Sequence, residues 1–300
     1  MILNILSWNL NFIHDNYFER TQNINKILKK EIEKCHIMAL QEAISPFSKI
    51  YKYIDSEKIK EYTHNEFFKE IDIITQYIQK LFPKKQQIIQ GAFEFLMDKI
   101  LYLIQIIYNK YGEYFKYLYF NYPKVAILLV LFFPFIFILC WFFIGMTTII
   151  HKDIDAIVKC KYIEKMFQYT KFNFNQREII FYNIHLTAGE KEFQKKKRLN
   201  TIKQIYEENK NTDILILAGD FNSKPNTDVY DFLINKGFRS CCMKIKKKEL
   251  FTFPSNKPRE CIDYIWVKGK NIEIKNYEVF GDKTHTDHLG IKASLDIHSL

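Results

Sequence analysis

The stretch Asp-Ile-Leu-Ile-Leu-Ala-Gly-Asp-Phe-Asn, residues 213–222, places four consecutive large aliphatic side chains directly before a group of polar ones. A short apolar run of this kind, followed by Gly219, is typical of a buried strand. Asp220 and Asn222 then stand at the end of that strand, where a loop begins. The segment therefore predicts an internal strand of a sheet that presents polar side chains at its carboxyl end.

The same pattern, an apolar run followed by polar residues, recurs on both sides of this segment. Between the runs, residues 16–34 and 190–209 carry apolar side chains at the spacing of an amphipathic helix. Strands that alternate with helices and carry polar residues at their ends predict an α/β or α+β sandwich, with a site assembled on the strand ends. The other predicted strands are 2–8, 37–40, 178–186, 261–267, 272–280 and 290–297.

The composition is that of a folded protein with an anionic partner. The chain has 300 residues, of which 48% are hydrophobic and 26% charged, and this length favours one two-layer core with an insertion. The net charge of +10 suits nucleic acid, a phosphorylated small molecule or an anionic membrane surface without choosing among them. Six cysteines without metal-finger spacing predict reduced thiols in a cytosolic environment. The first residues predict a strand rather than a signal peptide.

The polar residues at the strand ends have ordinary explanations when each is taken alone. Asn9 would be a turn residue, Glu42 a solvated carboxylate, and a single histidine a satisfied structural side chain. Their combination is more specific, because five strand ends present Asn, Glu, His, Asp-x-Asn, and Asp with Asp-His. Carboxylate and amide oxygens without cysteine suit a hard divalent cation rather than zinc. With histidine they suit phosphoester hydrolysis, which needs a metal on a phosphoryl oxygen, a base for water and donors for the developing charge.

These residues lie in motifs that resemble those of the endonuclease/exonuclease/phosphatase superfamily, which includes DNase I-like nucleases, inositol-polyphosphate phosphatases and neutral sphingomyelinases. The six motifs occur in the order typical of the family, and the resemblance covers residues 1–45 and about 145–297. It implies a DNase I-like α+β fold, in which a two-layer β-sandwich is flanked by helices. The motifs are Ser7-Trp8-Asn9, Leu40-Gln41-Glu42, Asn183-Ile184-His185-Leu186, Gly219-Asp220-Phe221-Asn222, Ile262-Asp263-Tyr264-Ile265 and Thr286-Asp287-His288.

The resemblance also implies a bound divalent cation, Mg²⁺ or Mn²⁺. Glu42 would be its principal ligand, and Asn9 and Asp287 would complete its surroundings. Two departures from the family pattern are visible. Thr286 stands where the family often has serine, and the strand expected soon after Glu42 is delayed to residues 145–150. The residues that contact substrate in that stretch cannot be assigned. The departures therefore leave the identity of the substrate undetermined, but they do not affect the predicted reaction.

The remaining site residues take catalytic roles in the family pattern. His288 would act as general base or, in the alternative, as a phosphate contact. Asp263 would accept a hydrogen bond from His288 and fix its tautomer. Asp220 and Asn222 would position water or the leaving group beside the scissile phosphate. His185 would donate to a phosphate oxygen.

A hydrophobic run interrupts the chain between these motifs. Residues 125–150, 26 residues counted inclusively, contain no charged side chain, and 125–144 is long enough to cross a bilayer, which takes about 20 apolar residues. A core helix followed by a strand is the alternative, but the run is apolar on every face, which exceeds what a two-layer domain can bury. We therefore expect residues 51–144 to be an insertion with a membrane-associated segment, and 1–50 with 145–300 to form the catalytic domain.

The two halves of the predicted site constrain how this insertion meets a membrane. Glu42 precedes the run and His185 follows it, so a single crossing would place them on opposite sides of the bilayer. The segment must enter and leave on the same side, as a helical hairpin with 93–110 as its first arm, or lie in the interface. Asp98 and Lys99, in the middle of that arm, make it a poor span, because a charge at mid-bilayer costs about 3 kcal/mol. Residues 93–144 are thus the expected membrane contact.

The sequence leaves three functions open. The first is a Mg²⁺-dependent phosphodiesterase on a membrane, similar to neutral sphingomyelinases, that cleaves a phospholipid headgroup, since an anchor beside the site would concentrate a lipid substrate. The second is a tethered nuclease or a phosphatase of sugar phosphates or inositol polyphosphates. The third is a membrane adaptor without catalysis, which the complete set of acidic, amide and histidine residues disfavours. We expect the first, with its catalytic domain in the cytosol, and the sequence predicts no oligomeric state.

Overall fold

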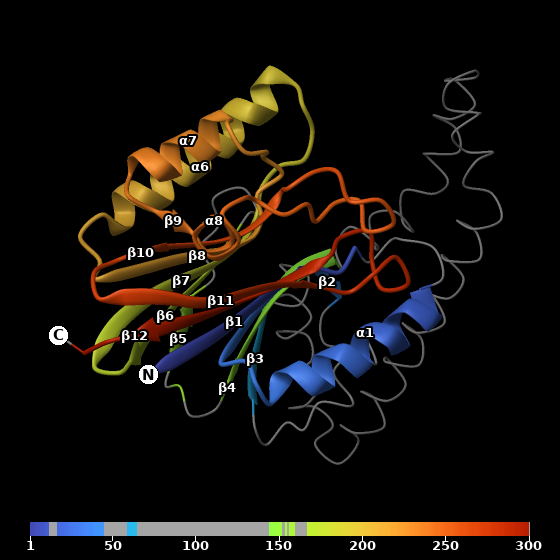
Figure 1. The fold of residues 1–300 in the computed structure, drawn as a ribbon, viewed down its shortest axis with the longest axis horizontal. Helices are drawn as coiled ribbons and strands as arrows, with labels where there is room; N and C mark the ends of the chain where they lie inside the picture. Colours follow the sequence, from blue (N-terminus) through green and yellow to red (C-terminus); the bar gives the residue numbers. More distant parts are fainter. Residues whose placement is uncertain are drawn as a thin grey trace, which may run out of the picture.

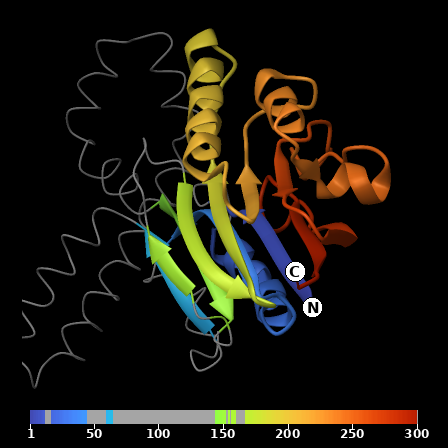
Figure 2. The same ribbon diagram turned by 90° about the vertical axis from the view of Figure 1, so that its left-hand side faces the viewer.

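The structure of the chain, a computed structural model, describes residues 1–11, 17–44, 59–64, 144–151, 154, 156–159 and 167–299. Two six-stranded sheets face one another, and helices cover their outer faces (Figure 1 and Figure 2). The layers are therefore helix, sheet, sheet and helix, with a hydrophobic core between each pair of neighbours.

The first sheet, sheet A, combines strands from the two ends of the chain. Its strands are β1 (Ile2–Asn9), β2 (Ile37–Ile44), β3 (Ile59–His64), β4 (Ile144–His151), β11 (Ile272–Phe280) and β12 (Gly290–Ile297). They lie in the order β11-β12-β1-β2-β4-β3. β1 and β2 run parallel, and α1 (Tyr17–Ile32) provides the crossover that a parallel pair requires.

The second sheet, sheet B, repeats this plan with the middle of the chain. Its strands are β5 (Ala156–Lys159), β6 (Phe167–Phe174), β7 (Arg177–His185), β8 (Ile214–Asp220), β9 (Arg239–Ser240) and β10 (Asp263–Lys268). They lie in the order β5-β6-β7-β8-β10-β9. β7 and β8 are again parallel and are joined by α6 (Glu192–Asn209). The helices α7 (Asp228–Asn235) and α8 (Cys241–Lys246) lie in the connection from β8 to β10.

The packing of β8 explains why its sequence is continuously apolar. Ile214 and Ile216 lie in the core between the two sheets. Leu215 and Leu217 alternate with them and lie in the outer core, with Ile202 of α6. A strand covered on both faces has no polar face, and its sequence therefore does not alternate. The sandwich places the carboxyl end of this buried strand at an edge where loops from both sheets meet.

The predicted sandwich flanked by helices is confirmed. The predicted helices 16–34 and 190–209 correspond to α1 and α6, and the delayed strand 145–150 corresponds to β4. The four cysteines within the described ranges are buried free thiols, as the sequence predicts.

The predicted insertion, residues 51–144, is described only in small part. β3 lies within it and pairs with β4, so sheet A takes in a piece of the chain that the sequence assigns to the insertion. The segments 93–110 and 125–143 lie outside the described residues. Among the residues that are described, no helix is long and apolar enough to span a membrane. The hydrophobic hairpin therefore stays a prediction.

Candidate active site

The carboxyl ends of the two parallel strand pairs carry the predicted site residues. Asn9 ends β1 beside Gln41 of β2, and His185 ends β7 beside Asp220 of β8. Asp263, the first residue of β10, lies directly opposite Asp220. Because each parallel pair ends at the same edge of its sheet, the sandwich brings polar residues from both sheets to one place.

The backbone at Glu42 departs from regular strand geometry. Glu42 has a positive φ of 47°, and the pairing of β2 with β4 is irregular between Leu40 and Ala43. A residue with a side chain costs on the order of 1 kcal/mol or more in this conformation, which persists only where the surrounding structure enforces it. Bulges of this kind commonly redirect a side chain next to a site.

The side chain of Asn9 joins the two sheets at this edge. Its Nδ2 donates to Oε1 of Glu42 at 3.2 Å and to Oδ2 of Asp220 at 3.0 Å. Its Oδ1 accepts a hydrogen bond from the backbone nitrogen of Asn11. In this arrangement the amide nitrogen, rather than the oxygen, faces the two carboxylates. The role of Asn9 as a metal ligand stays a prediction.

His185 faces the same two carboxylates from the end of β7. Its Nε2 lies 3.5 Å from Oε1 of Glu42 and 3.8 Å from Oδ2 of Asp220. Asn222 holds the neighbouring loop, because its backbone nitrogen donates to Oδ1 of Asp220 and its Nδ2 to the carbonyl oxygen of Leu186. The imidazole of His185 is partly exposed, so it can reach a ligand placed beside the carboxylates.

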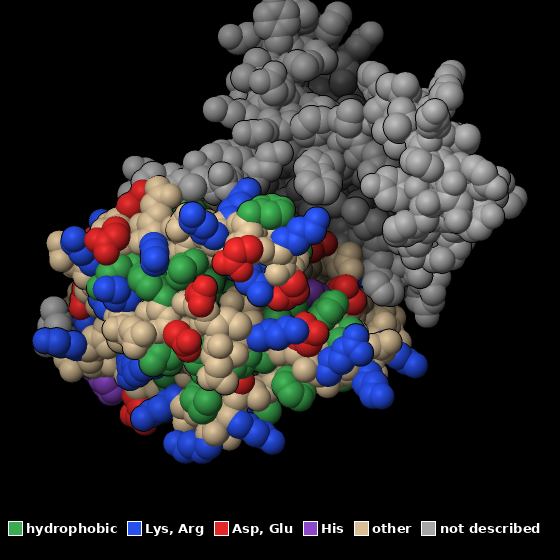
Figure 3. All heavy atoms as spheres, turned by 90° about the horizontal axis from the view of Figure 1, so that it is seen from above, with side chains coloured by type: hydrophobic (Ala, Val, Ile, Leu, Met, Phe, Trp, Pro, Cys, Tyr) green, Lys and Arg blue, Asp and Glu red, His purple; other side chains and the backbone are tan. Residues whose placement is uncertain are grey.

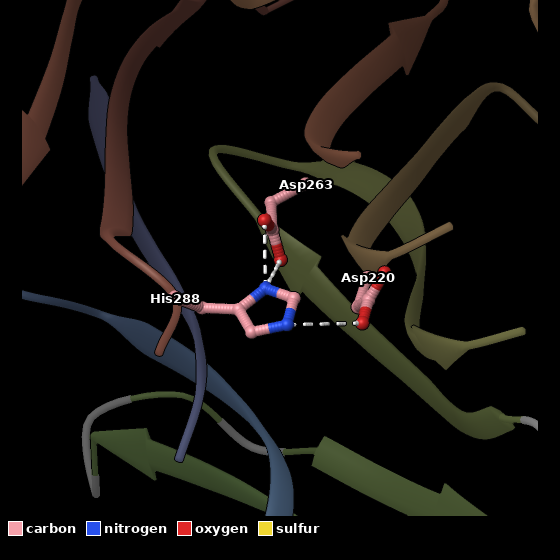
Figure 4. A group of neighbouring side chains, drawn as sticks. All are labelled: Asp220, Asp263 and His288. Atoms are coloured by element: carbon pink, nitrogen blue, oxygen red, sulfur yellow. Dashed lines mark hydrogen bonds and ion pairs between the residues drawn. The ribbon is translucent and has the colours of Figure 1, made fainter. Parts of the chain in front are cut away.

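His288 forms a pair with Asp263 in the buried part of the site (Figure 4). Its Nδ1 donates to the carboxylate of Asp263 at 3.0 and 3.1 Å, and its Nε2 lies 3.8 Å from Oδ2 of Asp220. The hydroxyl of Thr252 donates to Asp263 at 2.5 Å. The indole nitrogen of Trp8 donates to the carbonyl oxygen of His288. The predicted contact between Asp263 and His288 is present, whereas no sequence motif indicated Thr252.

The surroundings of this pair change the pKa of its neighbours. Burial lowers the pKa of His288, but the negative charges of Asp263 and Asp220 and the hydrogen bond to Asp263 outweigh burial and raise it to about 10. Burial raises the pKa of the Asp220 carboxyl to about 6, against the attraction of His288. These surroundings favour the protonated form of the His288 imidazole and the uncharged form of the Asp220 carboxyl.

Asp287 is connected to the site through its neighbours in the chain. Its carboxylate accepts a hydrogen bond from the hydroxyl of Thr286 at 3.3 Å, and that hydroxyl also donates to the carbonyl oxygen of Asn9 at 3.0 Å. The loop before β12 is thereby held against the end of β1. The negative charge of Asp287 contributes to the raised pKa of His288. Its role as a metal ligand is untested by these contacts and stays a prediction.

The donor set fits a hard divalent cation. The buried group Asp220, Asp263 and His288 has ligand atoms within 4.8 Å of one another. Asp263 already accepts from His288 and Thr252, so Asp220 is the member of this group best placed to bind a cation, together with Glu42 across the amide of Asn9. Carboxylate oxygens of this kind suit Mg²⁺ or Mn²⁺ better than softer metals.

Two buried arginines that the sequence reasoning missed hold the loops of the site. Arg20 of α1 donates to the carbonyl oxygens of Leu10 and His285 at 3.1 and 3.2 Å, and so ties the loop after β1 to the loop before β12. Arg198 of α6 donates to the carbonyl oxygen of Thr187, in the loop after β7. Charged groups this well buried require such partners.

Comparisons with known proteins agree with this fold. The sequence model described as the Endonuclease/Exonuclease/phosphatase family matches residues 6–288. No match was found among curated protein sequences.

Three solved structures illustrate the likeness in fold. TDP2 from D. rerio, in complex with a single-strand DNA product, is 12% identical with a TM-score of 0.59, over 98% of this chain and 99% of that chain. The endonuclease/exonuclease/phosphatase from Bacteroides vulgatus is 12% identical with a TM-score of 0.58, over 99% and 100%. The human Nocturnin catalytic domain with bound sulfate is 12% identical with a TM-score of 0.57, over 99% and 95%.

At such low identity these structures establish the fold alone. The family match, by contrast, extends from Leu6 in β1 to His288 and includes every strand end that carries a predicted site residue. The chain therefore belongs to the endonuclease/exonuclease/phosphatase family.

Proposed function

We propose that the chain is a divalent-metal-dependent phosphodiesterase that acts at the carboxyl ends of β1, β2, β7 and β8. Membership of the family indicates phosphoester hydrolysis. The observation that supports the metal most directly is the bridge made by Asn9 between the carboxylates of Glu42 and Asp220, with His185 facing both. Two carboxylates from different sheets are held close together, and a cation between them would offset their repulsion.

Glu42 and Asp220 are the proposed cation ligands, with Asp287 and Asn9 as the proposed neighbours. A divalent cation bound there polarises a phosphoryl oxygen and lowers the pKa of water. His185, which is partly exposed beside both carboxylates, is placed to donate to a phosphate oxygen.

His288 acts in this proposal as a charged donor rather than as a base. Its pKa of about 10 keeps a proton on the ring at neutral pH, and this favours the phosphate contact over the general base among its two expected roles. Asp263 stabilises the charged ring and fixes its orientation through Nδ1. The protonated Nε2 is then free to neutralise charge that develops on a phosphoryl oxygen.

Asp220, as a proposed cation ligand, is placed to position the attacking water beside the phosphate rather than to take its proton. Burial raises the pKa of its carboxyl, and a cation bound there would lower that pKa again and keep the carboxylate charged. Asn222 fixes the other carboxylate oxygen through its backbone nitrogen at 2.8 Å, so that Oδ2 is directed toward Asn9 and the histidines.

For the substrate we propose a phospholipid headgroup, as in neutral sphingomyelinases. The support is the uncharged run of the sequence, residues 125–150, which is long enough to hold the enzyme on a bilayer. The positive charge of the chain is not gathered into one patch on the face that carries α6 and α7, where Lys and Arg alternate with Asp and Glu (Figure 3). The mixed charge of this face does not favour a nucleic-acid substrate.

A nucleic-acid substrate is the second candidate. It is favoured by the likeness in fold to D. rerio TDP2, whose structure holds a single-strand DNA product, and by the net charge of +10. The two candidates predict different substrates under the same metal dependence, so a substrate panel separates them.

The test is hydrolysis with Mg²⁺ of sphingomyelin, lysophospholipids, inositol phosphates, single-stranded and duplex DNA, and RNA by the full-length chain. We expect the highest kcat/KM on a phospholipid. Faster hydrolysis of single-stranded DNA would replace the lipid proposal with the nuclease, and full activity in excess chelator would remove the metal from both.

The membrane contact proposed for residues 93–144 is tested without catalysis. The full-length chain is incubated with vesicles of neutral and of anionic phospholipid and then sedimented. We expect it to sediment with the vesicles at high salt, because an apolar contact is not screened as an electrostatic one is. A chain that stays in the supernatant with both vesicle types contradicts the contact, and with it the reason for preferring a lipid.

A further inference from the structure

Two motif residues have no part in the chemistry proposed above, although they stand next to residues that do. Gln41 directly precedes Glu42 on β2, and Asn183 lies two residues before His185 on β7. Both side chains are fully buried. Two amides therefore lie in the core immediately beneath the site.

The two amides meet across the gap between the sheets. Nε2 of Gln41 donates to Oδ1 of Asn183 at 2.8 Å, and also to the hydroxyl of Ser7 on β1 at 3.2 Å. Nδ2 of Asn183 returns a hydrogen bond to the carbonyl oxygen of Leu40 at 3.3 Å. Sheets A and B are thus connected by two hydrogen bonds at the level of the strand ends.

The connection extends sideways through further buried polar groups. Nδ2 of Asn183 also donates to the hydroxyl of Thr148 on β4 and to Oε1 of Gln168 on β6, both at 3.3 Å. The Thr148 hydroxyl donates to the same Gln168 oxygen at 2.6 Å. Five strands of the two sheets therefore share one buried polar network.

Burying these polar groups costs free energy in a core that is otherwise apolar. The sheets pack through aliphatic and aromatic side chains over most of their facing area, and polar groups buried there add little net stability even when they are satisfied. Apolar packing alone, however, tolerates small shifts of one layer against another, whereas hydrogen bonds fix direction and distance. Polar groups retained in such a place are best explained by a requirement for register.

The residues that need this register are the next ones along each strand. Glu42 has a left-handed backbone at an irregular position of β2, and its conformation depends on how the preceding residue is held. His185 must stay within 3.5 Å of the carboxylate of Glu42 although the two residues belong to different sheets. A shift of about 1 Å between the sheets would separate them, and site geometry tolerates little more than half of that.

We propose that Gln41 and Asn183 are positioning residues, which fix the two sheets beneath the site and thereby hold the cation ligand Glu42 beside His185, the donor to the phosphate. The proposal rests on the metal-dependent function proposed above. It assigns these amides no contact with substrate or metal. Their effect is exerted through the neighbouring residues.

The test compares two core substitutions that remove a buried amide. Gln41→Met keeps the length of the side chain but removes its hydrogen bonds to Asn183, to Ser7 and to the carbonyl oxygen of Ala39. Asn209→Leu is the matched control, because Asn209 is also a buried amide with two hydrogen bonds, to Tyr182 and to its own helix. Asn209 ends α6, at the opposite end of this helix from the site.

Two properties of the full-length chain are measured for each variant. The first is the affinity for Mn²⁺ alone, by titration calorimetry. The second is the position of the ring signal of His185 in the metal-free protein, by NMR. We expect Gln41→Met to weaken Mn²⁺ binding about 10- to 100-fold, the range for residues that support metal ligands, and to displace the His185 signal. Asn209→Leu should lower the unfolding temperature and leave both properties unchanged.

The exchange Gln41→Asn with Asn183→Gln provides a rescue that a purely structural role does not predict. It keeps both amides and the combined side-chain length, so it should recover most of the affinity that Gln41→Asn alone loses. If Gln41→Met does not fold, this set of single and double variants replaces it.

The outcomes separate this proposal from the function on which it rests. Mn²⁺ affinity and a His185 signal that stay as in the wild type, in a Gln41 variant with a lowered unfolding temperature, would overturn the positioning role. A wild-type chain that binds no Mn²⁺ would overturn the metal-dependent function instead. The His185 signal then decides the positioning role by itself, because it reports the surroundings of this side chain without a metal.

Discussion

Charged residues lie at both ends of the strands β7 and β8. The charges are matched in sign at one end and mostly negative at the other. At the start, the fully buried guanidinium of Arg177 donates to the carboxylate of Asp213 through Nε, at 2.6 Å, and through Nη2. Its Nη1 donates to the carbonyl oxygens of Lys270 and His298 at 2.9 and 3.1 Å. One positive charge meets one negative charge, and each nitrogen of the guanidinium has a partner.

At the other end of the same strands, about 26 Å away for nine residues in extended conformation, charges of one sign accumulate. The carboxylates of Glu42, Asp220, Asp263 and Asp287 gather around two imidazoles. Burial and mutual repulsion raise the pKa of Asp220.

A closed and neutral network such as that of Arg177 needs nothing further and serves stability. An open network in which carboxylates outnumber the imidazoles is, in the function proposed above, the place for a cation. The comparison predicts that changes at the two ends will affect different properties, activity at one end and stability at the other.

The largest effect is expected from Asp263→Asn. The variant can no longer stabilise the protonated ring of His288, and loss of one charged donor to the developing charge lowers a rate by about 10²- to 10³-fold. We expect the loss in kcat, with KM little changed, in steady-state kinetics on the best substrate of the panel. Thr252→Val, which removes only the hydrogen bond to Asp263, should give a much smaller loss. A kcat equal to wild type in Asp263→Asn would refute the orienting role.

At the opposite end, Arg177→Met should reverse this result. Arg177 is buried, whereas Asp213 stays one-third exposed, and losing a hydrogen bond to a charged group costs about 1.5–3 kcal/mol. Two carbonyl groups lose their donor as well. We expect a large fall in the free energy of unfolding in urea, with kcat of the folded protein unchanged. Arg177→Lys should recover only part of the stability, because an ammonium cannot donate to a carboxylate with two parallel bonds. A fall in kcat at full stability would contradict the division between the two ends.

A divalent cation should stabilise the folded protein through the site end of these strands and not through the Arg177 end. A ligand at 100 times its dissociation constant stabilises the folded state by about 2.7 kcal/mol. We expect Mn²⁺ to raise the unfolding temperature of the wild type and of Asp213→Asn equally, and to leave that of Glu42→Gln almost unchanged. An equal rise in Glu42→Gln would place the cation somewhere other than the site.

The smallest expected effect is the pH dependence of the unfolding free energy that comes from Asp213. The hydrogen bond and charge of Arg177 lower the pKa of Asp213 below its usual 3.8, against the effect of burial. A carboxyl whose pKa is lowered on folding contributes stability above its unfolded pKa, and this contribution is lost as the pH falls through the folded pKa. The difference in unfolding free energy between wild type and Asp213→Asn should therefore be constant above about pH 5 and shrink below pH 4. A difference that grows on acidification would contradict the assignment.

The sequence predicted the strands and the identity of the site residues better than their relations in space. The run 214–217 identifies a buried strand because its composition leaves no alternative, and the motifs mark Asp220 and His288 as site residues. The bridge from Asn9 to Asp220 could not be predicted, because it depends on how two sheets pack and on residues 211 positions apart. The left-handed backbone of Glu42 has no signal in its own residue type.

The sequence does carry a signal for the buried position of Arg198. It ends a basic run, Lys195 to Arg198, of a kind that usually marks a solvated face. It also stands four residues before Ile202 and seven before Ile205, on the buried face of α6. A charged residue in an apolar stripe at helical spacing indicates a buried partner, here the backbone carbonyls of the loop after β7.

If the strand ends form a metal-dependent phosphodiesterase site, hydrolysis of a simple phosphodiester must depend on the metal and on Glu42. Chelator-treated protein is titrated with Mg²⁺ while the hydrolysis of bis(p-nitrophenyl) phosphate, a simple phosphodiester, is followed at neutral pH. The account predicts no hydrolysis without the metal and a rate that rises with Mg²⁺ and saturates in the wild type, with no such rise in Glu42→Gln. A rate that does not depend on Mg²⁺, or one that rises equally in Glu42→Gln, would contradict it.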